Sequence, residues 1–230
     1  MPDFTNRLAL ITGASGGLGD AVVEAFLARG ATVVGVARSM KGDSNRERFH
    51  ALETDLTKPE GARAAVASAL EIAGKVDILV HVMGAFDGGK PVAETGDGTW
   101  DKMIALNLSA AFFMVRAVLP AMIEARYGRI VAVGSRAGVE PGPNLSAYNV
   151  SKAGLNTLIR TVALEGKEHG ITANVVMPST IDTPANREGM PTADFSRWVK
   201  PSAIAGQIVW LSSEAASDIS GALIPVYGRA

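Results

Sequence analysis

The sequence contains no cysteine, and this absence excludes several kinds of functional site. Without thiols the chain has no disulfide framework, no thiolate metal centre and no cysteine nucleophile. Its three histidines, His50, His81 and His169, are scattered and do not have the spacing of metal ligands. The sequence therefore predicts no metal site.

A strong net charge and long hydrophobic runs are also missing. The formal net charge is −1, which gives no indication of a nucleic acid or an anionic membrane as a partner. No apolar run of the signal-peptide kind precedes Leu8, and the later apolar stretches are much shorter than a membrane-spanning helix. We therefore expect a cytoplasmic protein that binds neither nucleic acid nor membrane.

The hydrophobic content is high enough for one large core. The chain has 230 residues, of which 47% are hydrophobic. A chain of this length and composition suits one domain, residues 1–230, with a sizeable buried core. Linkers, low-complexity tracts and internal repeats are not evident in the sequence.

The N-terminal part of the sequence predicts a strand, a glycine turn, a helix and a second strand. Residues 8–12 form a short apolar run, which is typical of a strand buried on both faces of a parallel sheet. Apolar residues from Leu18 to Leu27 follow at helical spacing, and residues 32–37 predict the next strand. This order is that of a βαβ unit.

The same alternation continues to the end of the chain. We predict strands at 49–56, 77–82, 129–133, 172–177 and 222–226, and helices at 59–73, 100–126, from Tyr148 onward and at 204–212. Elements that alternate at these lengths indicate an α/β fold with one doubly wound parallel sheet of about seven strands and helices on both faces. Residues 184–198 predict only a short irregular loop beside the substrate. In this architecture ligands bind beyond the carboxyl ends of the strands.

Glycines between the first strand and the first helix predict a dinucleotide site. Gly13, Gly17 and Gly19 allow the backbone to turn tightly and to approach a pyrophosphate at the helix N-terminus. The first gap is wider than in the usual G-x-G-x-x-G pattern. The alternative is a glycine turn that only joins a strand to a helix. This alternative is less favoured, because a strand precedes the glycines and a helix follows them, as in dinucleotide sites.

The end of the second predicted strand indicates which coenzyme is bound. A carboxylate there accepts hydrogen bonds from the adenosine ribose of NAD, whereas a cation accommodates the 2′-phosphate of NADP. Here the strand is followed by Arg38 and Ser39, and no acid occurs before Asp43. We predict NADP(H), with NAD(H) and a merely solvated loop arginine as the alternatives.

Tyr148 and Lys152 form the chemically most informative pair. They are four residues apart on a predicted helix, so the phenol and the ammonium share one face. A nearby cation favours the phenolate and brings the phenol pKa closer to neutrality, where it exchanges protons well. Ser135, thirteen positions before Tyr148, is able to bond the same substrate oxygen. A chance pair on a solvated helix face is the alternative for the tyrosine and lysine taken alone.

Taken together, these motifs resemble the short-chain dehydrogenase/reductase (SDR) family over nearly the whole chain. Thr12-Gly-x-x-x-Gly-x-Gly19 resembles the family's cofactor motif, and Asn174 to Thr183 resembles its N-x-x-x-P-G-x-x-x-T segment. Asn107, Ser135, Tyr148 and Lys152 match the family's catalytic tetrad. The resemblance implies a Rossmann-type fold and an NAD(P)-dependent oxidoreductase that interconverts a small carbonyl compound and its alcohol. Within the family, the sequence resembles members of the 3-oxoacyl-ACP reductase kind.

The resemblance also implies a role for each site residue. Tyr148 is expected to be the acid in reduction, Lys152 to hold the nicotinamide ribose and lower the phenol pKa, and Ser135 to polarise the carbonyl. Asn107 is expected to bind a water that links Lys152 to solvent. The implied cofactor-binding residues are Gly13, Ser15, Gly16, Gly17, Leu18, Gly19, Arg38, Ser39, Asp55, Leu56, Val82, Gly84, Tyr148, Lys152, Pro178, Ile181 and Thr183.

The sequence departs from the family pattern in three places. The N-N-A-G motif is replaced by His81-Val-Met-Gly84, and the usual Pro-Gly pair is Pro178-Ser179. A structural or ribose-adjacent role is favoured for His81 over that of an extra base. The segment after Thr183 is shorter than the partly helical lid that family members often have, which suggests an open pocket or one completed by a neighbouring subunit.

The substrate and the assembly are less well defined by the sequence. Phe86 and Arg136 are positioned to face a pocket, although Arg136 is equally suited to pair with Glu140. A 3-oxoacyl thioester is one candidate substrate class. A dihydropteridine- or quinone-type reductase and a non-catalytic NADP(H)-binding regulator are the alternatives. The family resemblance implies a homo-oligomer, a tetramer or a dimer, assembled through the helices at 100–126 and after Tyr148.

Overall fold

One parallel sheet organises the molecule. The computed structural model describes residues 2–40 and 46–229, so Asp43 lies outside the described residues. Within them the sheet has the strand order β3-β2-β1-β4-β5-β6-β7. The strands are β1 (Leu8–Thr12), β2 (Thr32–Ala37), β3 (Phe49–Glu53), β4 (Ile78–His81), β5 (Gly128–Val133), β6 (Ile171–Pro178) and β7 (Leu223–Val226). The predicted fold class is confirmed, and the order reverses between β1 and β4.

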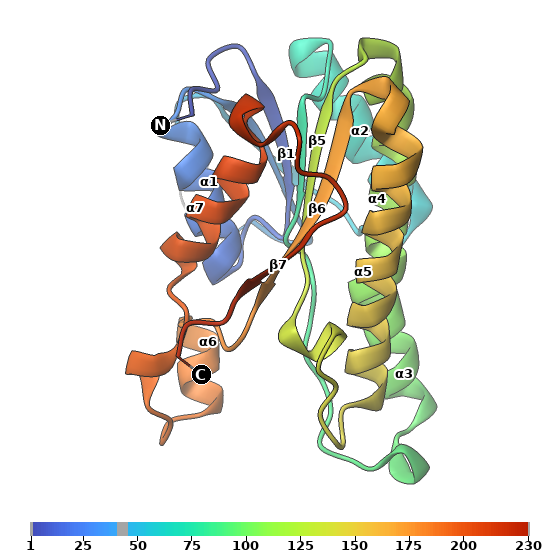
Figure 1. Ribbon diagram of the computed structural model, residues 1–230, viewed down its shortest axis with the longest axis vertical. Helices are drawn as coiled ribbons and strands as arrows, with labels where there is room; N and C mark the ends of the chain where they lie inside the picture. Colours follow the sequence, from blue (N-terminus) through green and yellow to red (C-terminus); the bar gives the residue numbers. More distant parts are fainter. Residues whose placement is uncertain (1, 41–45, 230) are drawn as a thin grey trace.

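Helices cover both faces of the sheet (Figure 1). They are α1 (Gly17–Leu27), α2 (Pro59–Ala73), α3 (Asp97–Ile104), α4 (Ala110–Ala125), α5 (Ser146–Gly166), α6 (Pro184–Gly189) and α7 (Pro201–Leu211). Helices α1 and α7 pack together on one face, while α2, α4 and α5 cover the other. Side chains of β1 alternate between the two cores, with Leu10 in one and Ile11 in the other. This two-sided burial explains the continuous apolar run of β1.

The long helix predicted at 100–126 is interrupted. It starts earlier, as α3, and a π-helical turn at Ala105–Ser109 separates α3 from α4. By length and composition alone, Asp97–Ala125 would be able to cross a membrane, contrary to the expectation that the apolar stretches are too short. It packs instead against α2 and α5. A helix in the core of a domain is often as long and as apolar as a membrane-spanning one, and this segment buries one face against the domain as a core helix does.

The segment predicted as an irregular loop, 184–198, is partly helical. Thr183 accepts a hydrogen bond from the backbone N–H of Asn186 at 3.3 Å and so caps α6, whose first residue is Pro184. The rings of Phe195 and Trp198 pack with centroids 4.7 Å apart. A proline at the first helical position has its φ already set for a helix. Local capping therefore orders a segment that lacks apolar periodicity.

The C-terminal residues fasten this segment to the rest of the molecule. The backbone N–H of Arg229 donates to the carbonyl of Arg197 at 3.1 Å, and the guanidinium Nε of Arg197 donates back to the carbonyl of Arg229 at 3.0 Å. Ser179, just after β6, donates to the carbonyl of Tyr227 at 2.6 Å. Figure 1 shows the C-terminus beside α6, away from the sheet's helical layers.

Candidate active site

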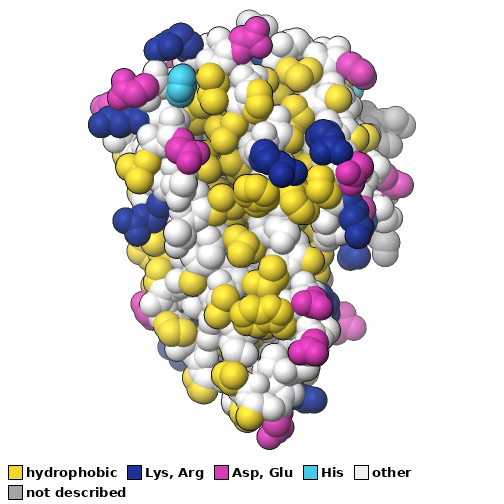
Figure 2. All heavy atoms as spheres, turned by 90° about the vertical axis from the view of Figure 1, so that its right-hand side faces the viewer, with side chains coloured by type: hydrophobic (Ala, Val, Ile, Leu, Met, Phe, Trp, Pro, Cys, Tyr) yellow, Lys and Arg dark blue, Asp and Glu magenta, His cyan; other side chains and the backbone are white. Residues whose placement is uncertain are grey.

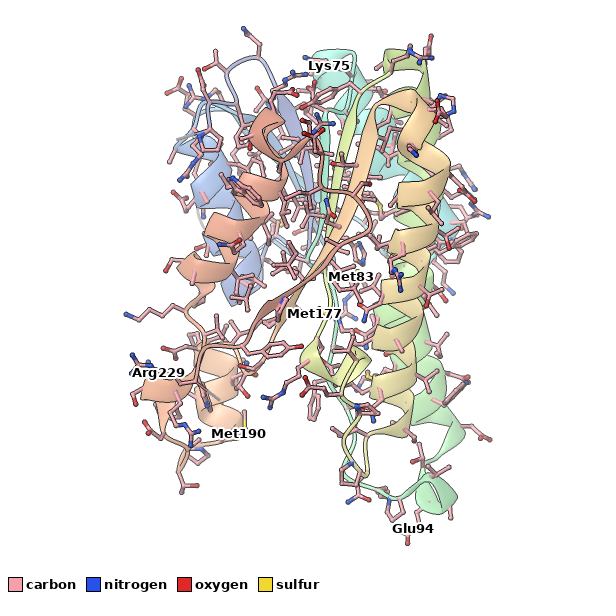
Figure 3. The ribbon with its side chains drawn as sticks, viewed as in Figure 1. Lys75, Met83, Glu94, Met177, Met190 and Arg229 are labelled. Carbon is pink, nitrogen blue, oxygen red and sulfur yellow. The ribbon has the colours of Figure 1, made fainter. Side chains whose placement is uncertain are left out.

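A cavity of about 980 Å³ opens at the carboxyl ends of the central strands. Met83 and Met190 both line the cavity, and Figure 3 shows Met190 on the α6 side. Most of the predicted site residues line this cavity. They are Gly13, Ser15, Gly16, Leu18, Gly19, Arg38, Ser39, Leu56, Val82, Gly84, Ser135, Tyr148, Lys152, Pro178 and Ile181.

The glycine turn has the geometry that a pyrophosphate requires. Gly13 has φ of +68°, and a Cβ at this position would lie 2.8 Å from the backbone nitrogen of Met83. A Cβ on Gly19 would collide with the carbonyl of Gly13. Helix α1 starts at Gly17 with Gly16 as its N-cap, without a side-chain cap in the described structure. The backbone N–H groups of the first turn therefore have no capping side chain as a partner. They suit an anion in the cavity.

Arg38 and Ser39 line the cavity at the end of β2 and are exposed. Asp55 lies near Arg38, but its carboxylate accepts hydrogen bonds from the backbone N–H of Thr57 at 2.9 Å and from the Thr57 hydroxyl at 2.7 Å. These bonds, more than the nearby cations Lys58 and Arg38, lower the pKa of Asp55. The carboxylate thus stabilises a turn, and the neighbouring Leu56 reaches the cavity instead.

Gly17 and Thr183 are not among the residues that line the cavity, although both were predicted to bind the cofactor. A Cβ on Gly17 would be 3.2 Å from the Thr183 side chain, so the two residues bring the start of α1 against the start of α6. Together they hold the segment after β6 close to the glycine turn. The two residues thus help to position neighbouring residues that line the cavity.

Ser135 and Tyr148 come together as predicted. Ser135 follows β5 in an extended conformation, and its hydroxyl accepts a hydrogen bond from the backbone N–H of Ala137 at 3.2 Å. Tyr148 lies in the first turn of α5. Burial raises the pKa of the Tyr148 phenol, and a hydrogen bond with Ser135 opposes part of this rise. The phenol is therefore a protonated hydrogen-bond donor at neutral pH.

Lys152 lies one turn further along α5 and is buried. Its ammonium donates a hydrogen bond to the backbone carbonyl of Val133 at 3.0 Å. Burial lowers the pKa of Lys152 to about 8. Burial is the largest influence on the pKa of Tyr148, and the expected lowering of that pKa by Lys152 stays a prediction. An ammonium has three N–H donors, so two remain for other partners.

Asn107 lies within the π-helical turn and is buried beside the cavity instead of lining it. Its amide oxygen accepts from the backbone N–H of Ala85 at 2.8 Å, and its amide nitrogen donates to the Ala85 carbonyl at 3.0 Å and to the Ser151 hydroxyl at 3.0 Å. A Cβ on Gly84 would lie 2.9 Å from the same amide oxygen. The side chain of Asn107 is thus committed to protein partners, so a water there would have to bind its backbone.

His81 is the least expected polar residue of the site. It is fully buried, and its Nδ1 lies 3.1 Å from the Thr12 hydroxyl. That hydroxyl accepts a hydrogen bond from the backbone N–H of Met83 at 3.2 Å, so its own proton is available for Nδ1. Burial, and to a smaller extent the charge of Lys152, lowers the pKa of His81 to about 3. His81 is thus neutral and structural, as its position in an apolar strand predicts.

Several residues that line the cavity were not predicted from the sequence. Thr54 and Thr180 lie just beyond the ends of β3 and β6, so the rule that ligands bind beyond strand ends would have found them. Leu145 and Asn186 also line the cavity but carry no local signal, because they belong to segments between or beyond the strands. Phe86, Arg136, Glu140 and Met190 line the cavity as well.

Comparison with known proteins gives the family. The profile described as short chain dehydrogenase matches residues 7–194. The chain belongs to this family. It is 32% identical to 3-oxoacyl-[acyl-carrier-protein] reductase FabG of Salmonella typhimurium over 98% of this chain and 97% of that protein. It is 30% identical to the short chain dehydrogenase ausX of Penicillium brasilianum, over 98% of this chain and 96% of that protein.

Solved structures agree with this assignment. The crystal structure of gox2181 superimposes with a TM-score of 0.88 at 31% identity, covering 98% of this chain and 96% of that one. Levodione reductase superimposes with a TM-score of 0.90 at 26% identity, covering 98% and 97%. This SDR protein is accordingly an oxidoreductase that acts on carbonyl or hydroxyl groups, and the family uses nicotinamide coenzymes.

The buried neutral histidine predicts a pH dependence of stability. The pKa of His81 is about 3 in the folded protein, against 6.5 for the unperturbed side chain. Between these values the unfolded chain binds a proton that the folded chain refuses, so the free energy of unfolding falls as the pH falls. The contribution of one such group approaches about 1.4 kcal/mol per pH unit.

Chemical denaturation between pH 4 and pH 7 checks this expectation. His81→Gln, which does not titrate, is expected to show a shallower pH dependence than the unmodified protein. His50→Gln, an exposed histidine of β3, serves as the matched control and is expected to keep the original slope. Identical slopes for all three proteins would contradict a buried neutral His81.

Proposed function

We propose that this SDR protein is an NADP(H)-dependent carbonyl reductase that converts a ketone or an aldehyde to the alcohol. One observation carries the proposal: Ser135, Tyr148 and Lys152 line one cavity together with the glycine turn and Arg38. A binding protein that only senses the coenzyme has no use for a half-buried phenol bonded to a serine hydroxyl and set one turn from a buried ammonium. A 3-oxoacyl thioester, the substrate class in the name of FabG, is a candidate.

In the proposed reduction, two hydroxyl groups receive the carbonyl oxygen. Ser135 accepts a hydrogen bond from the backbone N–H of Ala137, and its own proton, which is shared with Tyr148, would turn to the substrate oxygen. Tyr148 then donates its phenolic proton to the oxygen as negative charge develops there. The raised pKa of Tyr148 keeps that proton in place until the reaction requires it. A bound nicotinamide supplies the hydride.

Lys152 stabilises the phenolate that remains after proton donation. Its pKa of about 8 leaves most of the ammonium protonated at neutral pH. Of its three donors, one is held by Val133, and the other two are available for the ribose hydroxyls and for a proton path to solvent. A cation close to the phenolate compensates for the burial that disfavours this charged form.

The coenzyme end of the cavity supports NADP(H). The uncapped first turn of α1 would hold the pyrophosphate, and Arg38 and Ser39 would hold the adenosine 2′-phosphate. The nearby carboxylate of Asp55 is bonded to Thr57 and is less available for a ribose. An arginine next to a phosphate forms charge-assisted hydrogen bonds, which are stronger than neutral ones.

A second copy of the chain is the proposed partner of the α4 and α5 face. Figure 2 shows many hydrophobic side chains along the centre of this side of the molecule, with charged ones mostly toward its edges. Leu164 on α5 is 78% exposed, and Phe112 and Ile123 on α4 are also exposed. Large exposed apolar patches mark interaction surfaces. Most soluble oligomers are homo-oligomers, which favours a second copy of the chain as the partner.

Replacement of the phenol tests the catalytic assignment. Tyr148→Phe removes the proton donor and is expected to lower kcat for ketone reduction by about 10²–10⁴-fold, the usual contribution of a general acid. Binding of NADPH, measured by fluorescence titration, is expected to persist. Tyr127→Phe, a matched change just before β5 at the opposite end of that strand, is expected to retain activity. Undiminished turnover in Tyr148→Phe would contradict the mechanism, and coenzyme binding without turnover in the unmodified protein would favour a regulator.

Coenzyme preference tests the role of Arg38. Loss of a charge-assisted bond costs about 1.5–3 kcal/mol, so Arg38→Gln is expected to lower kcat/KM for NADPH by roughly 10–100-fold. The value for NADH is expected to change little. Arg63→Gln, an exposed arginine of α2, is the matched control. A preference of the unmodified protein for NADH would exclude this assignment.

Analytical ultracentrifugation tests the proposed assembly. Leu164→Glu places a charge on the apolar face and is expected to shift the protein to a smaller species, because the carboxylate would be desolvated in the interface. Leu164→Met keeps the apolar surface and is expected to remain assembled. A monomeric unmodified protein at micromolar concentration would refute the proposal.

A further inference from the structure

Phe86 is a large apolar side chain that the fold leaves in the open. It is 66% exposed and lines the cavity, beyond the Gly84 turn. Its ring lies edge-to-face with the ring of Tyr148, with centroids 5.0 Å apart and planes at 74°. The contact uses only part of the ring. The rest adjoins the cavity at the position where a carbonyl compound bonded to Tyr148 would extend.

The backbone around Phe86 is fastened on both sides. On one side Ala85 makes two hydrogen bonds with the Asn107 amide, at 2.8 Å and 3.0 Å. On the other, Asp87 pairs with Lys102 at 3.0 Å, and the backbone N–H of Gly89 donates to the carbonyl of Asn144 at 2.8 Å. The exposed ring therefore belongs to an anchored segment. Its exposure reflects its position and not a loose loop.

The surroundings of Phe86 favour an apolar ligand on this side of the cavity. Leu145 and Met190 also line the cavity, and Leu145 packs against the 86–89 segment at Gly88. Arg136 and Glu140 also line the cavity and bring charges of opposite sign. Because their charges are opposite, these two groups do not favour a ligand of one charge. The aromatic ring of Phe86 instead favours a ligand whose shape fits its face.

From these contacts, and resting on the proposed function, we propose that Phe86 determines specificity and selects ketones whose carbonyl carbon belongs to, or adjoins, a ring system that contains a flat aromatic ring. A flat ring packs on an aromatic face with about 0.5–1.5 kcal/mol beyond the gain from buried area. An open chain would also lose rotational freedom on binding. Because Phe86 contacts Tyr148, a ring resting on it keeps the carbonyl close to the phenol.

A pair of ketones of equal carbon number tests the inference. We expect NADPH-dependent kcat/KM to be higher for 2-tetralone than for 2-decanone. Phe86→Ala is expected to lower this ratio by about 2–10-fold, and Phe86→Trp to retain it. The matched control Val92→Ala removes another exposed apolar side chain, outside the cavity, and is expected to leave the ratio unchanged.

The ratio of the two kcat/KM values shows whether Phe86 selects the substrate or only holds Tyr148 in place. If Phe86 only supports the phenol, Phe86→Ala lowers kcat/KM for both ketones in parallel, and this outcome overturns the inference. A ratio in the unmodified protein that favours 2-decanone overturns it as well.

A binding measurement separates this inference from the proposed function. In the NADPH complex of Tyr148→Phe, the dissociation constants of both ketones are measurable by calorimetry without turnover. Tighter binding of 2-tetralone that is lost in Tyr148→Phe/Phe86→Ala supports the ring site, even if the unmodified protein reduces neither ketone and the reductase proposal fails. Equal binding of both ketones overturns the ring site, even if reduction is observed.

Discussion

The side-chain amide of Asn107 holds together the three segments from which the active site is built. It pairs with both backbone groups of Ala85 and donates to Ser151, whose hydroxyl in turn donates to the carbonyl of Tyr148 at 2.8 Å. Because the amide is buried, losing it would leave backbone groups without partners at a cost of about 1–3 kcal/mol each. The turn after β4, the start of α4 and the first turns of α5 therefore keep one relative position.

Burial controls the protonation of the polar groups in this region. Lys152 has a pKa lowered to about 8 and His81 one lowered to about 3, so one is mostly charged at neutral pH and the other is neutral. The positive charge of Lys152 further disfavours a second positive charge on His81. A single buried cation is thus placed one turn from the phenol of Tyr148.

The two ends of the cavity are constructed differently. The coenzyme end consists largely of backbone, with glycines that allow close approach and a helix N-terminus free of side-chain caps. The substrate end consists of side chains on fastened connections, among them Phe86, and of the segment around α6 that is tied to the C-terminal residues. Backbone geometry suits a coenzyme common to a family, whereas side chains on connections allow each member its own substrate.

The fold class was predictable from sequence because it rests on short-range patterns, and patterns of the same kind indicate the catalytic set, which stays a prediction. Runs such as Leu8–Thr12 and the alternation of strands with helices reflect burial in a parallel sheet, and Ser135, Tyr148 and Lys152 are recognised by type and spacing. The glycine turn and Gly84 follow from the need for close backbone approach. Element ends were less exact, as at β3, because pairing with β2 stops at Glu53.

Other properties depend on contacts between segments that are distant in the chain. The raised pKa of Tyr148 reflects burial, which no spacing reveals, and the commitment of Asn107 depends on how the turn after β4 meets α4. The order of segment 184–198 comes from capping by Thr183 and from pairing with the C-terminal residues. The edge-to-face contact of Phe86 with Tyr148 likewise exists only because the connection after β4 meets the first turn of α5. Local sequence patterns record which face of an element is buried, but not which distant group it is buried against.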